Sequence, residues 1–370
     1  MAIKPKVLVI SEFRGDQIHT MKPEAEILIG LVNQGLEIVL MTNADSRYIP
    51  RFEENGIRVI RFYPRSKFNL SDISFIRKEL RRTVYHVLYL VTDNRAVTAG
   101  MLAAINVPVK VVLYRGLCGN LSWYDPTSYT KHLNPRVDKI ICNGDAVQEY
   151  FHAQLFFNKS KTEVILKGHS LEWYKDVVAS DLNYLGISKT SFVATWVGHN
   201  RQRMKGIPDM IRATYYWPED SDMHLLLIGS NTETKKNLAL ARDSPNNNRI
   251  HFLGTISDPR GIVAASDVVV LASVKGEAAT RFIQESMSMG IAPVITDIPG
   301  NRDLVIHNET GIVVPIRDPR TLSEAIVKLH KNPELRERLG QASKERIRTF
   351  LTHESTVQKV SELFVRLAQA

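Results

Sequence analysis

Two glutamates eight positions apart are the residues of this chain best suited to hold an extended polar ligand. Glu277 follows an apolar run, 268–271, that predicts a buried strand. Glu285 lies among apolar residues at helical spacing, and the predicted helix ends at Gly290. Eight helical residues rise about 12 Å and leave the two ends roughly 80° apart around the axis. Each carboxylate accepts two hydrogen bonds, which suits the vicinal hydroxyls of a ribose or a hexose.

The start of this predicted helix is suited to a diphosphate. Free N–H groups and the positive end of the helix dipole point toward whatever lies before the first turn. We therefore expect one element to hold the ribose, the phosphates and the sugar of a nucleotide-sugar, with backbone N–H groups supplied by Ala278, Ala279, Thr280 and Arg281. The alternative is two surface glutamates on an amphipathic helix, and the flanking sequence disfavours it.

A basic loop follows the first predicted strand of the second half, 192–197. The loop is Gly-His-Asn-Arg-Gln-Arg-Met-Lys-Gly and spans 198–206. Cations aimed at a leaving diphosphate stabilise the negative charge that develops on it, so they lower the barrier to glycosyl transfer directly. Arginine binds phosphate in a two-pronged fork, and lysine acts as a compact charge. The alternative is a solvated basic loop with no ligand.

These segments resemble the donor half of the family 4 retaining glycosyltransferases of the GT-B fold. The resemblance rests on Glu277–(seven residues)–Glu285, on the sequence that follows to Thr296, and on the segments 300–303 and 310–315. It runs over most of the chain and is densest from 191 to 330. It implies two doubly wound Rossmann-like domains with an interdomain cleft, and transfer of a hexosyl or related group from a nucleoside-diphosphate-sugar with retention, giving an α-linkage. The implied acceptor is a glycan, a glycolipid or a small molecule.

The resemblance also implies a role for each matching residue. Glu277 would hold the hydroxyls of the donor sugar, and Glu285 those of the ribose. Lys205 would hold the diphosphate together with Arg201, for which Arg203 is the alternative because this loop is one residue longer than usual. On the nucleotide side we also expect Gly198 and Gly254, and on the acceptor or sugar side Gly15, Arg115, Asn120 and Trp123.

Two positions depart from the family pattern. Arg115 stands where family members often have a histidine that contacts the donor hexose. The residues after Glu277 are Ala-Ala-Thr, where the family has glycine, an apolar residue and then glycine or proline. Alanine adopts φ > 0 less readily than glycine, so we expect an altered donor pocket.

The length of 370 residues predicts two domains. Strands and helices alternate along the first half, which predicts a parallel sheet with helices on both faces, that is, an α/β fold. We expect an acceptor-side domain at 1–172, a hinge at 173–188, a donor-binding domain at 189–350, and a final helix at 351–370 that crosses back to the first domain. No apolar run reaches the roughly 20 residues of a membrane span. The N-terminus is too short for a signal peptide, and the two cysteines suit no disulfide scaffold, so we expect a cytoplasmic protein.

The segment 47–82 carries ten basic and four acidic residues with apolar residues between them. Such a segment can lie on an anionic bilayer, which would place the protein on the inner face of the membrane. The alternative is a solvated helix packed on its own sheet, and both can hold. The basic residues form no stripe with interleaved aromatics, so we expect no nucleic-acid partner.

The sequence also bears on metals, on the co-substrate and on rival activities. Asp220-Ser-Asp222 lies between a helix and the start of a strand, which predicts a turn rather than a metal-binding motif, and we expect no metal and no cofactor. The co-substrate would be a nucleotide-sugar, with UDP and GDP as the first choices. The rivals are an epimerase-like GT-B enzyme and a nucleotide-sugar-binding module without catalysis.

Overall fold

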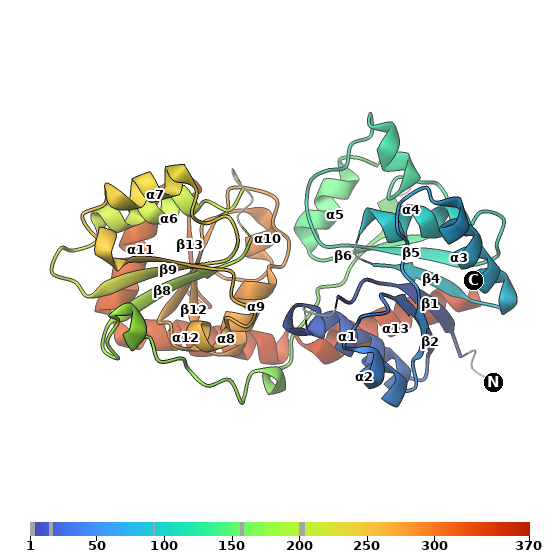
Figure 1. Ribbon diagram of the computed structural model, residues 1–370, viewed down its shortest axis with the longest axis horizontal. Helices are drawn as coiled ribbons and strands as arrows, with labels where there is room; N and C mark the ends of the chain where they lie inside the picture. The colour runs from blue at the N-terminus through green and yellow to red at the C-terminus, as the bar shows by residue number, and fades with distance from the viewer. Residues whose placement is uncertain (1–3, 15–17, 92, 156–158, 200–203) are drawn as a thin grey trace. The chain divides into compact units, whose positions relative to one another are not determined.

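The computed structural model divides the chain into two compact units (Figure 1). The first unit comprises the chain up to Gly168 together with His353–Ala370, and the second comprises His169–Thr352. The structure describes residues 4–14, 18–91, 93–155, 159–199 and 204–370.

A parallel sheet forms the centre of the first unit. In the described residues it has seven strands in the order β3-β2-β1-β4-β5-β6-β7. Its inner strands are short apolar runs buried on both faces, as parallel sheets require, whereas the edge strands β3 and β7 are only partly buried. They are β1 (Lys6–Ile10), β2 (Glu37–Thr42), β3 (Arg58–Arg61), β4 (Val87–Leu90), β5 (Lys110–Arg115), β6 (Lys139–Cys142) and β7 (Thr162–Val164). Its helices are α1 (Ile18–Asn33), α2 (Ile49–Glu54), α3 (Leu70–Arg82), α4 (Asn94–Ala103), α5 (Asp145–His152) and α13 (His353–Gln369).

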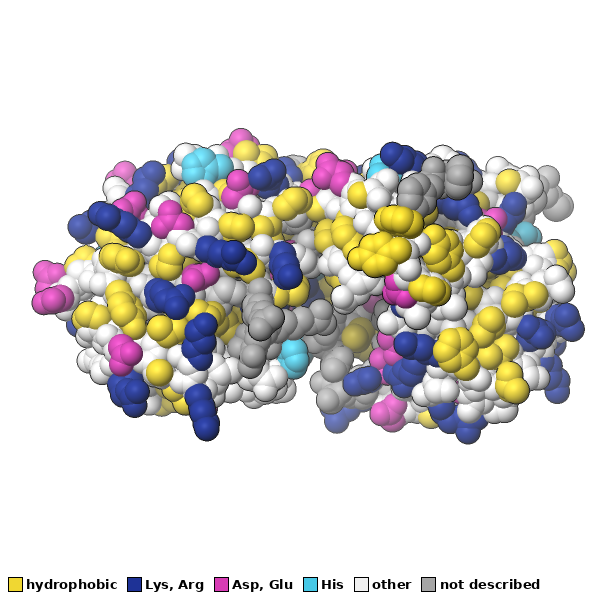
Figure 2. All heavy atoms as spheres, turned by 90° about the horizontal axis from the view of Figure 1, so that it is seen from above, with side chains coloured by type: hydrophobic (Ala, Val, Ile, Leu, Met, Phe, Trp, Pro, Cys, Tyr) yellow, Lys and Arg dark blue, Asp and Glu magenta, His cyan; other side chains and the backbone are white. Residues whose placement is uncertain are grey.

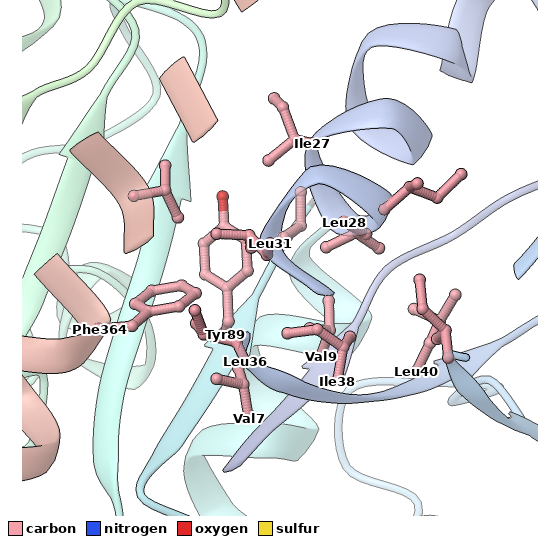
Figure 3. Close-up of a cluster of buried hydrophobic side chains, with 14 of the residues drawn as sticks. Val7, Val9, Ile27, Leu28, Leu31, Leu36, Ile38, Leu40, Tyr89 and Phe364 are labelled. Carbon is pink, nitrogen blue, oxygen red and sulfur yellow. The ribbon is translucent and has the colours of Figure 1, made fainter. Parts of the chain in front are cut away.

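The core of the first unit joins the two ends of the chain. Leu28 and Leu31 of α1 lie over Val9 of β1 and pack in one buried cluster with Phe364 of α13 (Figure 3). The ring of Tyr89 meets that of Phe364 edge-on, with 5.3 Å between their centroids. Burying a large aromatic side chain contributes about 1.5–3 kcal/mol, so Phe364 fastens the C-terminal helix to this unit.

The second unit repeats the architecture. In the described residues its sheet has six parallel strands in the order β10-β9-β8-β11-β12-β13. They are β8 (Phe192–Val197), β9 (Met223–Ile228), β10 (Ile250–Gly254), β11 (Val268–Leu271), β12 (Ala292–Thr296) and β13 (Ile312–Val314). The helices are α6 (Ile207–Ala213), α7 (Lys235–Arg242), α8 (Arg260–Ala264), α9 (Arg281–Ser288), α10 (Pro299–Arg302), α11 (Pro319–Lys331) and α12 (Pro333–Thr349). Helices α6, α7 and α11 cover one face, and α8, α9 and α12 the other (Figure 1). The predicted class of two doubly wound α/β units is confirmed.

The predicted hinge lies at the wrong place. The chain passes from the first unit to the second between Gly168 and His169, so residues 173–188 belong to the second unit. The cause is two apolar side chains in an otherwise polar stretch. Leu182 and Ile187 are 6% and 2% exposed and pack in a buried cluster with residues of the second sheet.

Candidate active site

Two neighbouring strands bring the candidate site loops together. β8 and β11 pair in parallel, with Ala194 opposite Val268. Their following loops therefore leave the same edge of the sheet, where ligands bind in open α/β folds. The two loops are joined directly, because Val274 N donates to Met204 O at 2.8 Å.

A glycine allows this close approach. Gly206 has φ +64°, and a Cβ built on it would lie 1.8 Å from the backbone oxygen of Ala272. Only a residue without a side chain fits there. The turn is thereby pressed against the end of β11, which fixes the backbone of the neighbouring Lys205.

Lys205 and Glu277 form the central ion pair of the site. Lys205 Nζ lies 2.6 Å from Glu277 Oε1, and the two side chains are 15% and 7% exposed. Ser273 Oγ donates to the same oxygen at 2.5 Å, and Thr280 Oγ1 donates to Glu277 Oε2 at 3.2 Å. The structure thus brings together two residues predicted from sequence, and it holds the carboxylate in one orientation.

A further layer supports the Glu277 loop from β12 and α10. Thr296 Oγ1 donates to Ser273 O at 2.5 Å, and Asn301 Nδ2 donates to Thr296 O at 2.8 Å. A Cβ on Gly300 would lie 2.2 Å from Glu277 O, so the backbone of α10 touches that of the loop. Sequence reasoning assigned no role to Ser273 or Thr296. The sequence does contain a clue to them, because a residue with a hydroxyl group stands at the carboxyl end of each of two adjacent apolar strands.

Glu285 lies in a second group of polar side chains. It belongs to α9, its side chain is 12% exposed, and Arg281 Nε lies 3.5 Å from Oε1. Burial raises the pKa of the Glu285 carboxyl, while the charges of Arg281 and Arg260 act in the opposite direction. Burial and the charge of Glu285 both raise the pKa of the Tyr174 hydroxyl. Tyr174 therefore belongs to the same group of interacting side chains as Glu285.

More of this carboxylate than of Glu277 is left to accept hydrogen bonds from a ligand. Within the described parts of the chain no group donates a hydrogen bond to Glu285, and Arg281 at 3.5 Å is its nearest cation. A buried carboxylate with open acceptor sites suits a ligand that brings its own hydroxyls. Sequence reasoning missed Tyr174 and Arg260 beside it.

Glycines end three adjacent strands beside these loops. Gly198 N donates to Ile228 O at 3.0 Å, and Gly229 N donates to Gly254 O at 2.6 Å. A Cβ on Gly229 would lie 1.6 Å from Gly198 O. Gly198 and Gly254, predicted on the nucleotide side, therefore lie at one edge of the sheet, and Gly229 joins them as a residue that the sequence reading did not single out.

The loop after Glu277 packs into the unit. Ala278 and Ala279 are 4% and 8% exposed, so they line the inner side of the loop. Three predicted residues, Gly15, Arg201 and Arg203, lie outside the described residues.

The predicted acceptor-side residues Arg115, Asn120 and Trp123 lie in the first unit, at the end of β5 and in the loop after it. Arg115 Nε donates to Leu117 O at 3.0 Å, and its Nη2 donates to Gly119 O. Its guanidinium thus fastens its own loop. Asn120 has φ +54°, and Trp123 is 47% exposed.

In the parts of the chain that the structure describes, no three His, Cys, Asp or Glu side chains are grouped so that they could hold a metal ion. Nor is any helix of those parts long and apolar enough to span a bilayer.

Comparisons with known proteins agree with this architecture. The family model described as Glycosyl transferases group 1 matches residues 182–346, and that described as Glycosyltransferase Family 4 matches residues 25–173. A relative from Escherichia coli, the UDP-Gal:alpha-D-GlcNAc-diphosphoundecaprenol alpha-1,3-galactosyltransferase, is 26% identical over 52% of this chain and 51% of its own length. Three other relatives match over 63%, 46% and 50% of their own lengths, so the chain spans less than two thirds of each of these curated relatives.

Solved structures share the fold over nearly the whole chain. A glycosyltransferase from Rickettsia africae ESF-5 superposes with a TM-score of 0.81 at 16% identity, covering 98% of each chain. The Anabaena protein Alr3699/HepE, solved in complex with UDP, superposes with a TM-score of 0.75 at 18% identity, covering 97% of this chain and 99% of that one. The two family matches and the two parallel-sheet units together give this chain the architecture of the family 4 glycosyltransferases.

Proposed function

We propose that the chain is a retaining glycosyltransferase that moves a sugar from a nucleoside-diphosphate-sugar to a hydroxyl of a glycan or lipid-linked acceptor, forming an α-linkage. The observation that carries this proposal is the Lys205–Glu277 pair, held at the carboxyl edge of the second sheet by Ser273 and Thr280. A carboxylate and a cation fixed side by side suit the hydroxyls of a sugar and the diphosphate attached to it.

The residues of the pair act on different parts of the donor. During transfer the bond between the anomeric carbon and the diphosphate oxygen breaks, and negative charge grows on the leaving group. The ammonium of Lys205, only 15% exposed, stabilises that charge more strongly than a solvated lysine would. Arg201 or Arg203 would add a second cation. The chain's own cations thus neutralise the leaving group, and the proposed reaction is independent of metal.

Glu277 positions the sugar. Its Oε1 is occupied by Lys205 and Ser273, whereas Oε2 has one partner at 3.2 Å and can accept from a sugar hydroxyl. The acceptor oxygen then bonds to the anomeric carbon on the face that the diphosphate leaves. The acceptor's proton passes to an oxygen of that diphosphate, so no protein base is required.

We infer that the donor is a UDP-sugar. A GDP-sugar is the other donor to test. The support is that Alr3699/HepE was solved with UDP and that the name of the Escherichia coli relative specifies UDP-Gal and a diphosphoundecaprenol acceptor. The reaction itself is tested by incubating the protein with UDP- and GDP-sugars and acceptor hydroxyl compounds, and following release of nucleoside diphosphate. Nuclear magnetic resonance of the product gives the anomeric configuration, and an inverted product would refute retention.

A thermal-shift series separates the rival activities. Binding of UDP or GDP stabilises the fold by mass action, about 2.7 kcal/mol at one hundred times the dissociation constant. Stabilisation together with release of nucleoside diphosphate that depends on an acceptor supports transfer of the sugar to that acceptor. Stabilisation without release indicates a binding module, and an isomerised sugar indicates an epimerase. No stabilisation by either nucleotide at millimolar concentration would overturn the proposed site.

Replacing Glu285 by glutamine tests the ribose assignment. The variant Glu285→Gln should bind UDP and UDP-sugar more weakly by the same factor, roughly 10- to 100-fold, because hydrogen bonds to a charged group contribute about 1.5–3 kcal/mol. Because burial raises the pKa of this carboxyl, it protonates at a higher pH than an ordinary glutamate, and the affinity of the wild type for UDP should fall on acidification. The variant has no such group, so its affinity should vary less with pH. Calorimetric titration checks both, and unchanged UDP affinity would remove Glu285 from the site.

We also propose that the first unit contacts an anionic membrane at the cytoplasmic inner face through α3 and the residues before it. Exposed apolar side chains and cations share this segment: Phe68 and Leu70 are 62% and 81% exposed and follow Lys67 in the sequence, and Lys78 and Arg81 are exposed further along α3. Most of the other basic residues of 47–82 have structural partners. Arg65 is paired with Asp72, Arg82 with Glu79, and Arg77 donates to Leu102 O.

The membrane test therefore reverses only cations without such partners. The triple variant Lys67→Glu/Lys78→Glu/Arg81→Glu should lose sedimentation with phosphatidylserine vesicles, since each basic residue near the surface contributes about 1 kcal/mol. The matched control is Lys189→Glu/Lys331→Glu, which changes two exposed lysines of the second unit. If the triple variant sedimented with these vesicles as well as the wild type does, the proposed membrane contact would be refuted.

A further inference from the structure

A cavity of about 980 Å³ lies in the second unit beside α6, α7 and α11. Five basic residues and one acidic residue line it among small and apolar ones: Arg212, Lys235, Lys236, Lys275, Arg317 and Asp209. They come from separate segments, namely α6, the start of α7, the loop after β11 and the residue before the N-cap of α11. Figure 2 looks onto the face formed by α6 and α7, where Lys and Arg side chains surround neutral and apolar surface.

The positive charge of this cavity is not neutralised within the described protein. Only Arg212 has an acidic partner, Asp209, at 3.2 Å. Across the described ranges the side chains of Lys235, Lys236, Lys275 and Arg317 form no hydrogen bond, ion pair or ring contact. The net charge of the lining is therefore +4.

Three of the five cations act on one carboxyl of the lining. The charges of Arg212, Arg317 and Lys236 all lower the pKa of Asp209, against the larger opposing effect of its burial. Like charges gathered in this way repel one another and destabilise the unit unless an anion neutralises them. Elsewhere in the unit exposed arginines have close acidic partners, as in Arg302 with Asp297 and Arg348 with Glu345, both at 2.5 Å.

This cavity is separate from the Lys205–Glu277 pair. The ammonium of Lys205 is bound to Glu277, and neither residue lines the cavity, although Gly206 and Val274 of the same two loops do. Helix α6 packs against α7 on one side and α11 on the other. Lys235 and Lys236 therefore approach the cavity from one side of α6 and Arg317 from the other.

We propose that this cavity binds a molecule that carries two separate phosphate groups. A phosphate monoester carries a charge of about −1.5 to −2, so two of them neutralise a net charge of +4. Cations on both sides of α6 favour two separated phosphates over one diphosphate. The volume is at the upper end of small-molecule sites, which span roughly 300–1,000 Å³. The same chemistry is found in soluble sugar bisphosphates and in bisphosphorylated lipid headgroups.

The test uses glucose 1,6-bisphosphate as the soluble probe and calorimetric titration of the whole chain. We expect saturable one-to-one binding, with glucose 6-phosphate at least ten-fold weaker. The variant Lys236→Glu/Arg317→Glu should bind the bisphosphate at least ten-fold more weakly, while the matched control Lys189→Glu/Lys331→Glu should bind it as the wild type does. Thermal melting of each variant shows that it is folded. Sedimentation with phosphatidylcholine vesicles containing phosphatidylinositol 4,5-bisphosphate, with the same variants, shows whether a lipid headgroup also enters.

Three outcomes would overturn the inference. They are equal weakening by the control variant, binding of neither the soluble nor the lipid probe, and loss of bisphosphate binding in Lys205→Ala with retention in Lys236→Glu/Arg317→Glu. The last outcome would show that the probe occupies the site of the ion pair. The inference does not depend on the proposed transfer reaction, because Lys236→Glu/Arg317→Glu is predicted to release nucleoside diphosphate at the wild-type rate.

Discussion

Replacing Glu277 by glutamine is expected to lower kcat/KM for glycosyl transfer by roughly 10²- to 10³-fold, the loss typical of removing one preorganised electrostatic contact at a reacting group. The amide keeps the shape of the side chain, but its single carbonyl oxygen can accept from only one of Ser273 and Thr280, which donate to different oxygens of Glu277. It also loses the negative charge 2.6 Å from the Lys205 ammonium. Release of nucleoside diphosphate, measured over a range of donor concentrations, gives kcat/KM for the variant and the wild type.

The same substitution should reduce stability, and a double variant separates the two effects. With the side chains 15% and 7% exposed, removing one partner leaves a mostly buried charge unpaired, at a cost of about 3 kcal/mol. Replacing both partners, in Lys205→Met/Glu277→Gln, should recover most of the stability and none of the activity. The control is Glu324→Gln, a glutamate 65% exposed on α11. Wild-type turnover in Glu277→Gln would contradict the proposed role.

The sequence was enough to predict which loops carry Lys205 and Glu277, and the strand order explains why the structure brings these loops together. Lys205 and Glu277 each follow an apolar run that is recognisable as a strand, and parallel strands deliver their following loops to one edge. β11 spans the apolar run 268–271 from which a strand was predicted. The pairing of β8 with β11 is what places the two residues 2.6 Å apart.

The surroundings of Glu285 could not be read in the same way. Tyr174 and Arg260 interact electrostatically with Glu285 but belong to other segments of the chain. Neither residue lies in a motif. Tyr174 belongs to a stretch whose polar composition predicted a hinge, but that stretch is held in the second unit by Leu182 and Ile187. Two buried apolar side chains are enough to attach such a segment to one unit. They have little effect on a composition averaged over sixteen residues, so the average does not reveal them.

The basic cavity went unnoticed for a related reason. Its cations are scattered over more than one hundred positions of sequence, from Arg212 to Arg317, and no window of the chain contains enough of them to stand out. They meet because α6 lies between α7 and α11. Charge that gathers only through tertiary packing is invisible to a reading of local composition.

Replacing Gly206 by alanine is expected to lower transfer activity by about 100-fold, because displacing a catalytic group by about 1 Å costs that much. Alanine at φ +64° is strained, and its Cβ would lie 1.8 Å from the backbone oxygen of Ala272. Neither the backbone of β11 nor that of the turn can absorb so short a contact without moving. Lys205, the residue before Gly206, must move with the turn and away from Glu277.

A second glycine of the same unit isolates the effect of the clash. Gly186 has φ +73°, and a Cβ built there meets nothing within 4 Å. Gly186→Ala should therefore cost only the backbone strain, about 1–2 kcal/mol, and should leave kcat unchanged. Gly206→Ala should unfold at a lower temperature than Gly186→Ala and lose activity well below either melting transition. If the two variants melted alike and both transferred sugar at the wild-type rate, the tight turn would not be what positions Lys205, and the ion pair would have to be held by Ser273 and Thr280 alone.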